Sequence, residues 1–315
     1  MRDLRIVFMG TPEFAVSSLR KIIEAGYNVV GVITAPDRPA GRGRKLQQSD
    51  VKKYALEQNL NVLQPTNLKS ENFQQELKQL RPNVHVVVAF RMLPQSIWAL
   101  PEYGTFNLHA SLLPQYRGAA PINWSIINGD KSTGVSTFFI DKKIDTGAMI
   151  LQRELTIEEN ENVGQLHDRL MESGAKLIVE TLELIKNEIV ETREQEETGS
   201  LKPAPKLTKE NTRIDWEKPV AEIYNLIRGL NPYPAAWTIL QNASEEYKVK
   251  IFESEKILGS HELSAGSIVI DEKNLKIAAP DGFIQIYEMQ LPGKRKMAIR
   301  DLLNGFSFDS EAKML

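Results

Sequence analysis

Asn107 and His109 stand two residues apart at the end of a stretch that has the pattern of a strand. Side chains at positions i and i+2 of a strand point to the same face. The amide and the imidazole would therefore lie together, with Phe106, Leu108 and Ala110 against an apolar layer on the other face. Two such groups touching one reacting atom would suit acyl-group chemistry. The alternative is a polar pair that hydrogen-bonds to itself on a sheet edge, and a bare Asn-x-His pattern favours that alternative.

A carboxylate that orients the imidazole is the next group that such a site needs. Asp141 and Asp145 both follow an apolar strand pattern that ends near residue 140. Either carboxylate beside His109 would fix the tautomer of its ring. Asp145 could instead simply begin a turn, since aspartate is a frequent turn residue. Residue type and spacing leave the two aspartates nearly equal.

The first half of the chain alternates strand patterns with helical patterns. We expect strands at 4–9, 29–34 and 84–90 and helices at 13–25, 51–58 and 71–80. Such alternation predicts a parallel sheet covered by helices on both faces, which binds ligands at the carboxyl ends of its strands. Asn107 and His109 lie at one of these ends. Gly10-Thr11-Pro12, after the first strand, lacks the glycine pattern of a dinucleotide site.

The second half has a different pattern. A helix is expected at 164–186, followed by a polar, acidic stretch without periodicity, which is typical of a linker. A helix at 219–230 then precedes short strands near 248–253, 266–270, 275–279 and 283–288. This spacing predicts a small antiparallel barrel, although spacing alone does not distinguish a barrel from a sandwich. The expected division is a first domain at 1–190, a linker at 191–208 and a second domain at 209–315.

Three segments together resemble the folate-dependent formyltransferase family: Gly10-Thr11-Pro12-Glu13-Phe14, the run from Phe106 to Gly118, and Asp145-Thr146-Gly147. The resemblance covers essentially the whole chain. It implies an α/β fold, with a Rossmann-like parallel-sheet domain followed by a smaller OB-like β-barrel. It also implies transfer of a formyl group from N10 of 10-formyltetrahydrofolate to an amine. Asn107, His109 and Asp145 align with the family's catalytic residues, so the resemblance separates Asp145 from Asp141.

The resemblance further implies where the folate co-substrate binds. Residues 89–94 correspond to a loop whose main chain usually reads the pterin ring. Here the loop departs from the common Ala-Tyr-Gly pattern, with Phe90 and Arg91, and is one residue shorter. The segment 111–114 resembles the family's other folate contact. The expected folate contacts are Phe90, Met92, Leu93, Ser111, Leu112, Leu113 and Pro114.

The basic segment 36–46 resembles the loop that grips the acceptor arm in members of the family that act on tRNA. The partner implied is initiator Met-tRNA, whose methionine α-amino group would accept the formyl group. The residues expected to bind tRNA are Arg38, Arg42, Arg44, Lys45, Lys206, Lys294, Arg295 and Lys296. The same catalytic residues would serve any amine, so a formyltransferase for an amino sugar nucleotide or other small amine is one alternative. A non-catalytic nucleic-acid-binding protein is the other.

Composition narrows the remaining possibilities. A chain of 315 residues is long enough for about two domains. It has no cysteine, which excludes disulfides and thiolate metal sites, and its histidines lack metal-ligand spacing, so we expect no metal. The net charge of -2 means that any contact with nucleic acid must be local. No signal peptide or bilayer-crossing segment is evident, so we expect a cytoplasmic protein. We also expect the protein to be a monomer.

Overall fold

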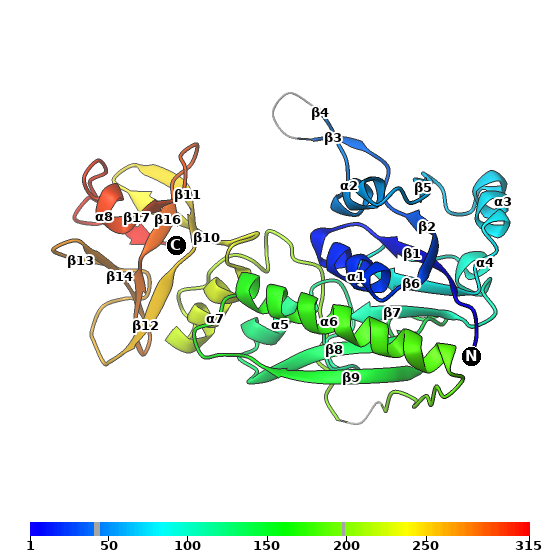
Figure 1. Cartoon of the computed structure of the whole chain (residues 1–315). Helices are drawn as coiled ribbons and strands as arrows, with labels where there is room; N and C mark the ends of the chain where they lie inside the picture. The colour runs from blue at the N-terminus through cyan, green and yellow to red at the C-terminus, as the bar shows by residue number, and fades with distance from the viewer. Residues whose placement is uncertain (41–44, 197–198) are drawn as a thin grey trace. The chain divides into compact units, whose positions relative to one another are not determined.

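A computed structural model gives the structure of the chain and describes residues 1–40, 45–196 and 199–315. Its central feature is a seven-stranded sheet of order β5-β2-β1-β6-β7-β8-β9 (Figure 1). The strands are β1 (Arg5–Gly10), β2 (Asn28–Ile33), β5 (Val62–Leu63), β6 (Val84–Val88), β7 (Thr105–His109), β8 (Ser132–Phe139) and β9 (Met149–Thr156). The helices in this part of the chain are α1 (Glu13–Glu24), α2 (Asp50–Glu57), α3 (Glu71–Gln79), α4 (Gln95–Trp98), α5 (Pro121–Ile127) and α6 (Val163–Lys186). A separate ribbon pairs β3 (Arg38–Ala40) with β4 (Lys45–Gln47).

The sheet has the parallel pairing expected of a Rossmann-like domain and is mixed, because it also contains an antiparallel pair of strands. β1 pairs in parallel with β2 and β6, and β6 pairs in parallel with β7. β7 and β8, however, are antiparallel. Parallel neighbours need a crossover that returns the chain to the edge where the first strand began, whereas β8 enters the sheet at the edge where β7 leaves it. The carboxyl ends of β1, β6 and β7 still meet at one edge, which is where ligands bind in such sheets.

Apolar side chains hold helices against both faces of the sheet. On one face, Met9 and Val87 share a core with Leu77 of α3. On the other face, Leu108 of β7 packs closely on α6, where a Cβ added at Gly174 would lie 2.6 Å from Leu108 Cδ2. The absence of a side chain at Gly174 therefore lets α6 approach β7, because any larger residue would meet Leu108.

The last third of the chain forms antiparallel strands around a second core, which also includes α7 (Val220–Leu230). The strands are β10 (Ala236–Asn242), β11 (Glu245–Ile251), β12 (Ser254–Leu258), β13 (Ile268–Asp271), β14 (Asn274–Ala279), β15 (Gly282–Ile286), β16 (Glu288–Gln290), β17 (Met297–Ala298) and β18 (Lys313–Met314), with the short helix α8 (Ile299–Leu302). They form sheets of order β17-β16-β11-β10-β18 and β12-β15-β14-β13. A bridge from Ser267 to Lys313 joins two edges, and β11 and β15 lead directly into β12 and β16. The pairings thus return on themselves, which confirms the small antiparallel barrel.

The chain divides into two compact units. Unit 1 comprises Met1–Gly118, Thr133–Leu155 and His167–Pro203, and unit 2 comprises Ala119–Ser132, Thr156–Leu166 and Ala204–Leu315. α5 and the first turn of α6 therefore belong to the same unit as the barrel. The domain limits expected from the sequence stay a prediction, since a compact unit need not fold alone. Within the described ranges, no helix has both the length and the apolar composition that spanning a bilayer requires.

His85 of β6 makes the stability of the fold depend on pH. The side chain is fully buried, and burial lowers its pKa from 6.5 to about 3. Its Nδ1 lies 3.3 Å from Thr105 Oγ1, and in the described part of the chain its Nε2 has no hydrogen-bond partner. As the pH falls below the unfolded value, only the unfolded chain gains this proton, so stability drops by about 1.4 kcal/mol per pH unit.

We therefore expect the variant His85→Asn, which keeps a donor for Thr105, to be less sensitive to acid. Between pH 7 and pH 5, the free energy of unfolding should fall by about 2 kcal/mol less in the variant than in the parent, because the titrating group is gone. Urea unfolding at the two pH values measures this difference. Equal losses in both proteins would contradict the assignment.

Candidate active site

β7 brings Asn107 and His109 to the face of the sheet opposite α6. In register, Asn107 lies between Val87 of β6 and Phe138 of β8. Leu108 packs on α6, so the residues on either side of it face the other way. His109 is buried, with 6% of its surface exposed, and Asn107 is half-buried. The strand thus orients the amide and the imidazole to one side.

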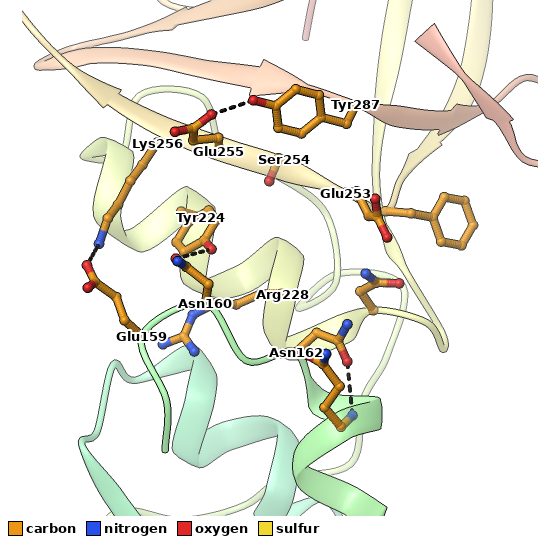
Figure 2. A pocket seen from close by; sticks show the side chains of 13 residues that line it. Glu159, Asn160, Asn162, Tyr224, Arg228, Glu253, Ser254, Glu255, Lys256 and Tyr287 are labelled. Carbon is orange, nitrogen blue, oxygen red and sulfur yellow. Dashed lines mark hydrogen bonds and ion pairs between the residues drawn. The ribbon is translucent and has the colours of Figure 1, made fainter. Parts of the chain in front are cut away.

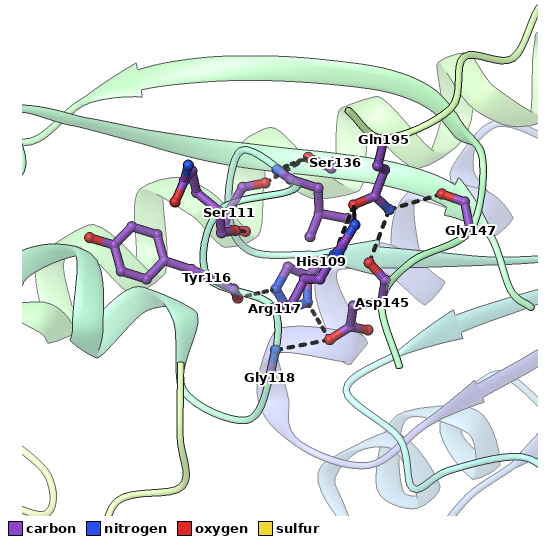
Figure 3. Close-up of polar contacts among 11 residues, drawn as sticks. His109, Ser111, Tyr116, Arg117, Gly118, Ser136, Asp145, Gly147 and Gln195 are labelled. Atoms are coloured by element: carbon purple, nitrogen blue, oxygen red, sulfur yellow. Dashed lines mark hydrogen bonds and ion pairs between the residues drawn. The ribbon is translucent and has the colours of Figure 1, made fainter. Parts of the chain in front are cut away.

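The His109 ring has two close polar neighbours (Figure 3). Its Nε2 lies 2.8 Å from the main-chain oxygen of Tyr116. Since a carbonyl oxygen only accepts hydrogen bonds, Nε2 carries a proton and donates it. Nδ1 lies 3.8 Å from Asp145 Oδ2. The neutral ring therefore presents its lone pair at Nδ1 beside the carboxylate, and a proton taken up there would form an ion pair.

A turn after β8 carries Asp145. Its φ of +55° is a left-handed conformation that residues other than glycine seldom adopt. Its Oδ2 accepts a hydrogen bond from the Gly118 N–H at 3.0 Å. Asp141 instead accepts from Lys143 N and Thr146 Oγ1, both at 2.9 Å, so its carboxylate closes the turn. Of the two aspartates, Asp145 is the one beside the imidazole.

A residue expected to lie in a linker contacts the same turn. Gln195 Nε2 donates to the main-chain oxygens of Asp145 and Gly147, both at 2.9 Å (Figure 3). Its Oε1 accepts from Arg117 Nε and Nη2, at 3.1 and 2.9 Å. Sequence analysis missed these contacts, because the acidic stretch around Gln195 carries no periodic signal.

The family model for formyl transferases matches residues 4–182, and the model for the formyl transferase C-terminal domain matches residues 206–307. The chain belongs to the formyl transferase family. The methionyl-tRNA formyltransferase of Flavobacterium johnsoniae is 58% identical over 314 residues, which is 100% of each chain. That of Bacteroides thetaiotaomicron is 55% identical over 317 residues and covers 99% of this chain and 98% of its own.

Solved structures share the fold of this formyltransferase at lower identity. A sugar 3N-formyl transferase, in the presence of dTDP and 5-N-formyl-THF, matches with a TM-score of 0.65 and 21% identity, covering 94% of this chain and 100% of its own. An N-formyltransferase from Helicobacter canadensis, in complex with folinic acid and dTDP-3-aminofucose, matches with a TM-score of 0.65 and 24% identity, covering 90% of this chain and 98% of its own. At such identities the likeness establishes the fold alone.

The residues of this formyltransferase that are expected to contact folate differ in burial. Three are buried within the fold: Leu93, Ser111 and Leu113. Phe90, Leu112 and Pro114 are half-buried, and Met92 is 72% exposed. The Ser111 hydroxyl is already engaged, since it donates to the Gln115 carbonyl at 2.6 Å. The buried members can therefore offer a ligand mainly their backbone, whereas the exposed members can offer side chains.

A cavity of about 530 Å³ adjoins the loop that carries Met92, and its walls include Lys69 and Arg91. Arg91 stands where the resemblance described above implies a glycine. Its guanidinium donates to the carbonyls of Pro65 and Thr66. Partial burial, and then the nearby charge of Arg38, lower the pKa of Arg91. The substitution for glycine therefore adds a cation to this loop, and two main-chain oxygens fix its position.

A second cavity, of about 510 Å³, lies within unit 2 (Figure 2). Most of its polar groups bond to one another. The buried Arg228 donates to the Glu161 carbonyl at 2.9 Å, and Tyr224 donates to Asn160 Oδ1 at 2.9 Å. Burial lowers the pKa of Arg228. These bonds tie the loop before α6 to α7, which favours a structural role for the cavity walls.

The basic residues expected to bind tRNA have different surroundings. Arg42 and Arg44 lie outside the described residues, and only the backbone of Lys45, in β4, is described. Five others have exposed side chains: Arg38, Lys206, Lys294, Arg295 and Lys296. Lys296 forms an ion pair with Glu288 at 2.5 Å and lies 5.3 Å from the centroid of the Phe252 ring. The positive charge of Lys296 is therefore largely compensated within unit 2.

Another basic cluster in unit 2 surrounds Trp237. The basic sequence around residues 206–213 pointed to Arg213, but not to Trp237 or Lys248. Lys248 Nζ lies 3.7 Å from the centroid of its ring, and the Arg213 guanidinium lies at 5.6 Å. Trp237 Nε1 donates to the Lys209 carbonyl at 2.9 Å. Cations held against an aromatic face keep defined positions, which suits contact with phosphates. The alternation of lysines along β11, with Lys248 and Lys250, was the available sequence signal.

The turn that carries Asp145 depends on Gly147. A Cβ at this position would lie 1.7 Å from the Phe139 carbonyl oxygen, so the backbone would have to move. We expect Gly147→Ala to lower the free energy of unfolding by about 1–3 kcal/mol and to reduce activity by displacing Asp145. Gly259, whose Cβ would meet no atom within 4 Å, provides the control Gly259→Ala. Thermal unfolding of the two variants measures the effect, and equal stability would show that the turn adapts.

Proposed function

We propose that this formyltransferase moves the formyl group of 10-formyltetrahydrofolate to the α-amino group of methionine on initiator Met-tRNA. The full-length identity of 58% to the methionyl-tRNA formyltransferase of Flavobacterium johnsoniae carries this proposal. The proximity of His109 to Asp145 supports it, since the two groups can handle the proton that the reaction must transfer.

In the proposed reaction the amine nitrogen attacks the formyl carbon and a tetrahedral intermediate forms, whose oxygen is negative. The bond from that carbon to N10 then breaks. The amine loses one proton and N10 gains one, so the products are a formylated amine and tetrahydrofolate. Donors that face the developing oxyanion are commonly the largest catalytic contribution. Asn107 can donate through its amide, and His109 can donate once it is protonated.

The proposed proton carrier is His109 Nδ1. Because Nε2 donates to the Tyr116 carbonyl, Nδ1 is the nitrogen that can accept the proton of the attacking amine. Asp145, at 3.8 Å from Nδ1, would stabilise the resulting imidazolium. The hydrogen bond from Gly118 N–H holds the carboxylate in that place. Protonation of N10 then returns the ring to its neutral form.

Folate and the acceptor arm of tRNA are the proposed partners. The loop from Phe90 to Pro94 and the segment 111–114 would form the folate site, with exposed Met92 as a side-chain wall. Basic residues of the 36–46 segment and of unit 2 would contact phosphates. Relatives that act on sugars share the fold at 21–24% identity, well below the identity to the tRNA enzymes. We further propose a cytoplasmic monomer that needs no metal.

The catalytic assignment is testable by single substitutions. Asn107→Ala, His109→Ala and Asp145→Asn should each lower kcat by about 100-fold or more, because each removes a group that acts on the transition state. The affinity for Met-tRNA should change by less than about twofold, because none of the three binds the RNA. Formyl transfer assays and filter binding measure the two quantities.

Asp141→Asn is the matched control, because Asp141 closes the same turn and points its carboxylate elsewhere. It should keep most of the parent's turnover. If Asp141→Asn lost activity while Asp145→Asn kept it, the assignment of the carboxylate would be wrong. If the protein formylated amino sugar nucleotides faster than Met-tRNA, the proposed acceptor would be wrong and an amino sugar nucleotide would take its place.

The binding of tRNA by unit 2 is testable by its salt dependence. Each lost phosphate contact should reduce the slope of log affinity against log salt by about one. We expect the pair Arg213→Ala and Lys248→Ala to flatten the slope more than Lys296→Ala, since Lys296 is paired with Glu288. Initiator and elongator tRNA should weaken alike, because phosphate contacts carry no sequence information.

The decisive comparison is with the double variant Lys294→Ala and Arg295→Ala, which removes two exposed cations from the turn between β16 and β17. If this pair flattens the slope and the pair beside Trp237 does not, tRNA binds the turn instead. If neither pair changes the slope, unit 2 does not bind tRNA through these residues.

A further inference from the structure

Three residues predicted to lie in a linker, Arg193, Gln195 and Lys202, are bound to the parts of unit 1 that hold the candidate catalytic pair. Arg193 makes an antiparallel bridge with Met149 at the start of β9. Gln195 reaches the turn of Asp145, as described above. Lys202 accepts from the Tyr116 N–H at 2.7 Å through its carbonyl, and its own N–H donates to Gln115 Oε1 at 2.8 Å. Each of these three residues is thus held by hydrogen bonds to other parts of unit 1.

Both partners of the His109 ring are held by these residues. Tyr116 supplies the carbonyl that Nε2 contacts, and its N–H is bound to Lys202. Asp145 supplies the carboxylate near Nδ1, and its carbonyl is bound to Gln195. The orientation of the ring on one side and the position of the carboxylate on the other thus depend on residues outside the motifs.

Of these residues, Gln195 makes side-chain hydrogen bonds to both sides of the candidate catalytic pair. One amide nitrogen uses both of its hydrogens on two carbonyls of the same turn, those of Asp145 and Gly147. The amide oxygen accepts from two nitrogens of Arg117, the residue after Tyr116. Gln195 therefore links the backbone around Asp145 to the segment that orients His109. Figure 3 shows this side chain between the two segments.

The turn needs such support because Asp145 has a positive φ. A residue other than glycine in the left-handed region relaxes to a commoner conformation unless its surroundings prevent it. Relaxation would rotate the carboxylate away from Gly118 N–H and from His109. A shift of about 1 Å in a catalytic group can cost about 100-fold in rate.

We propose that Gln195 is a positioning residue for catalysis: it holds Asp145 in the left-handed conformation that directs its carboxylate at His109. The proposal rests on the function proposed above, in which Asp145 and His109 handle the proton. The segment around Gln195, which the sequence presents as a tether, is then part of the active-site framework.

Two substitutions distinguish the role of the Gln195 amide nitrogen, which donates, from that of the amide oxygen, which accepts. Gln195→Ala removes every contact. Gln195→Glu keeps an acceptor for Arg117 but replaces the donors with a carboxylate that faces two carbonyl oxygens. We expect both variants to lower kcat by roughly 10- to 100-fold, with KM for folate and for Met-tRNA within about twofold of the parent. Glu194→Ala is the matched control, because Glu194 is exposed on the same segment, and it should keep the parent's kcat.

A double-mutant cycle distinguishes positioning from general loss of structure. If Gln195 acts only through Asp145, then Asp145→Asn combined with Gln195→Ala should be about as slow as Asp145→Asn alone, since the same group is already lost. If instead the fold losses in kcat of the two single variants multiply in the double variant, and its melting temperature is lowered, Gln195 has a merely structural role and the proposal is overturned. Both acceptors, Met-tRNA and a methionine ester, should suffer the same fold loss.

The outcomes also separate this proposal from the function on which it rests. If Asp145→Asn keeps normal turnover, the proton-handling assignment fails and the role of Gln195 fails with it. If Asp145→Asn is slow while Gln195→Ala and Gln195→Glu match the parent, the proposed function stands and the positioning role is overturned.

Discussion

The candidate site depends on one constraint, which is that His109 has a fixed partner at each ring nitrogen. The Tyr116 carbonyl takes the Nε2 proton and Asp145 faces Nδ1, so the tautomer and the orientation of the ring are set together. Neither partner comes from β7, the strand that carries the histidine. One comes from the turn after that strand, and the other from the turn after β8, its antiparallel neighbour.

This constraint explains features of the fold that would otherwise look incidental. β8 runs antiparallel to β7, with Phe139 opposite Phe106, and the turn that follows β8 then places Asp145 beside His109. Gly147 allows the turn to pass close to the Phe139 carbonyl. Ser136 accepts from Leu113 N–H and donates to the Ser111 carbonyl, so β8 also holds the segment expected to contact folate. Strand β8 thus supports both the candidate catalytic carboxylate and the segment proposed to contact folate.

In the proposed function the two units have different chemical tasks, and these tasks require different distributions of charge. The buried site in unit 1 needs few charges, because a catalytic imidazole and carboxylate work best where water is scarce. A nucleic acid needs exposed cations instead, and these lie on loops and strand faces such as that of Trp237. A net charge of -2 is compatible with both, since attraction for phosphates depends on local clusters and not on the total.

The sequence by itself determined the local elements and the motif. The six elements expected in the first half have ends within two residues of those observed, because periodic apolar residues and glycines act over short distances. It also placed Asn107 and His109 on one face. The sequence did not predict β10 and β12. It also did not predict that β8 runs antiparallel to β7, because pairing direction depends on contacts between distant segments. The choice of Asp145 over Asp141 by geometry, the contact of His109 with Tyr116 and the hydrogen bonds of Gln195 were decided only by the tertiary structure. Each of these joins segments that are separate in the chain, and no local pattern encodes such a contact.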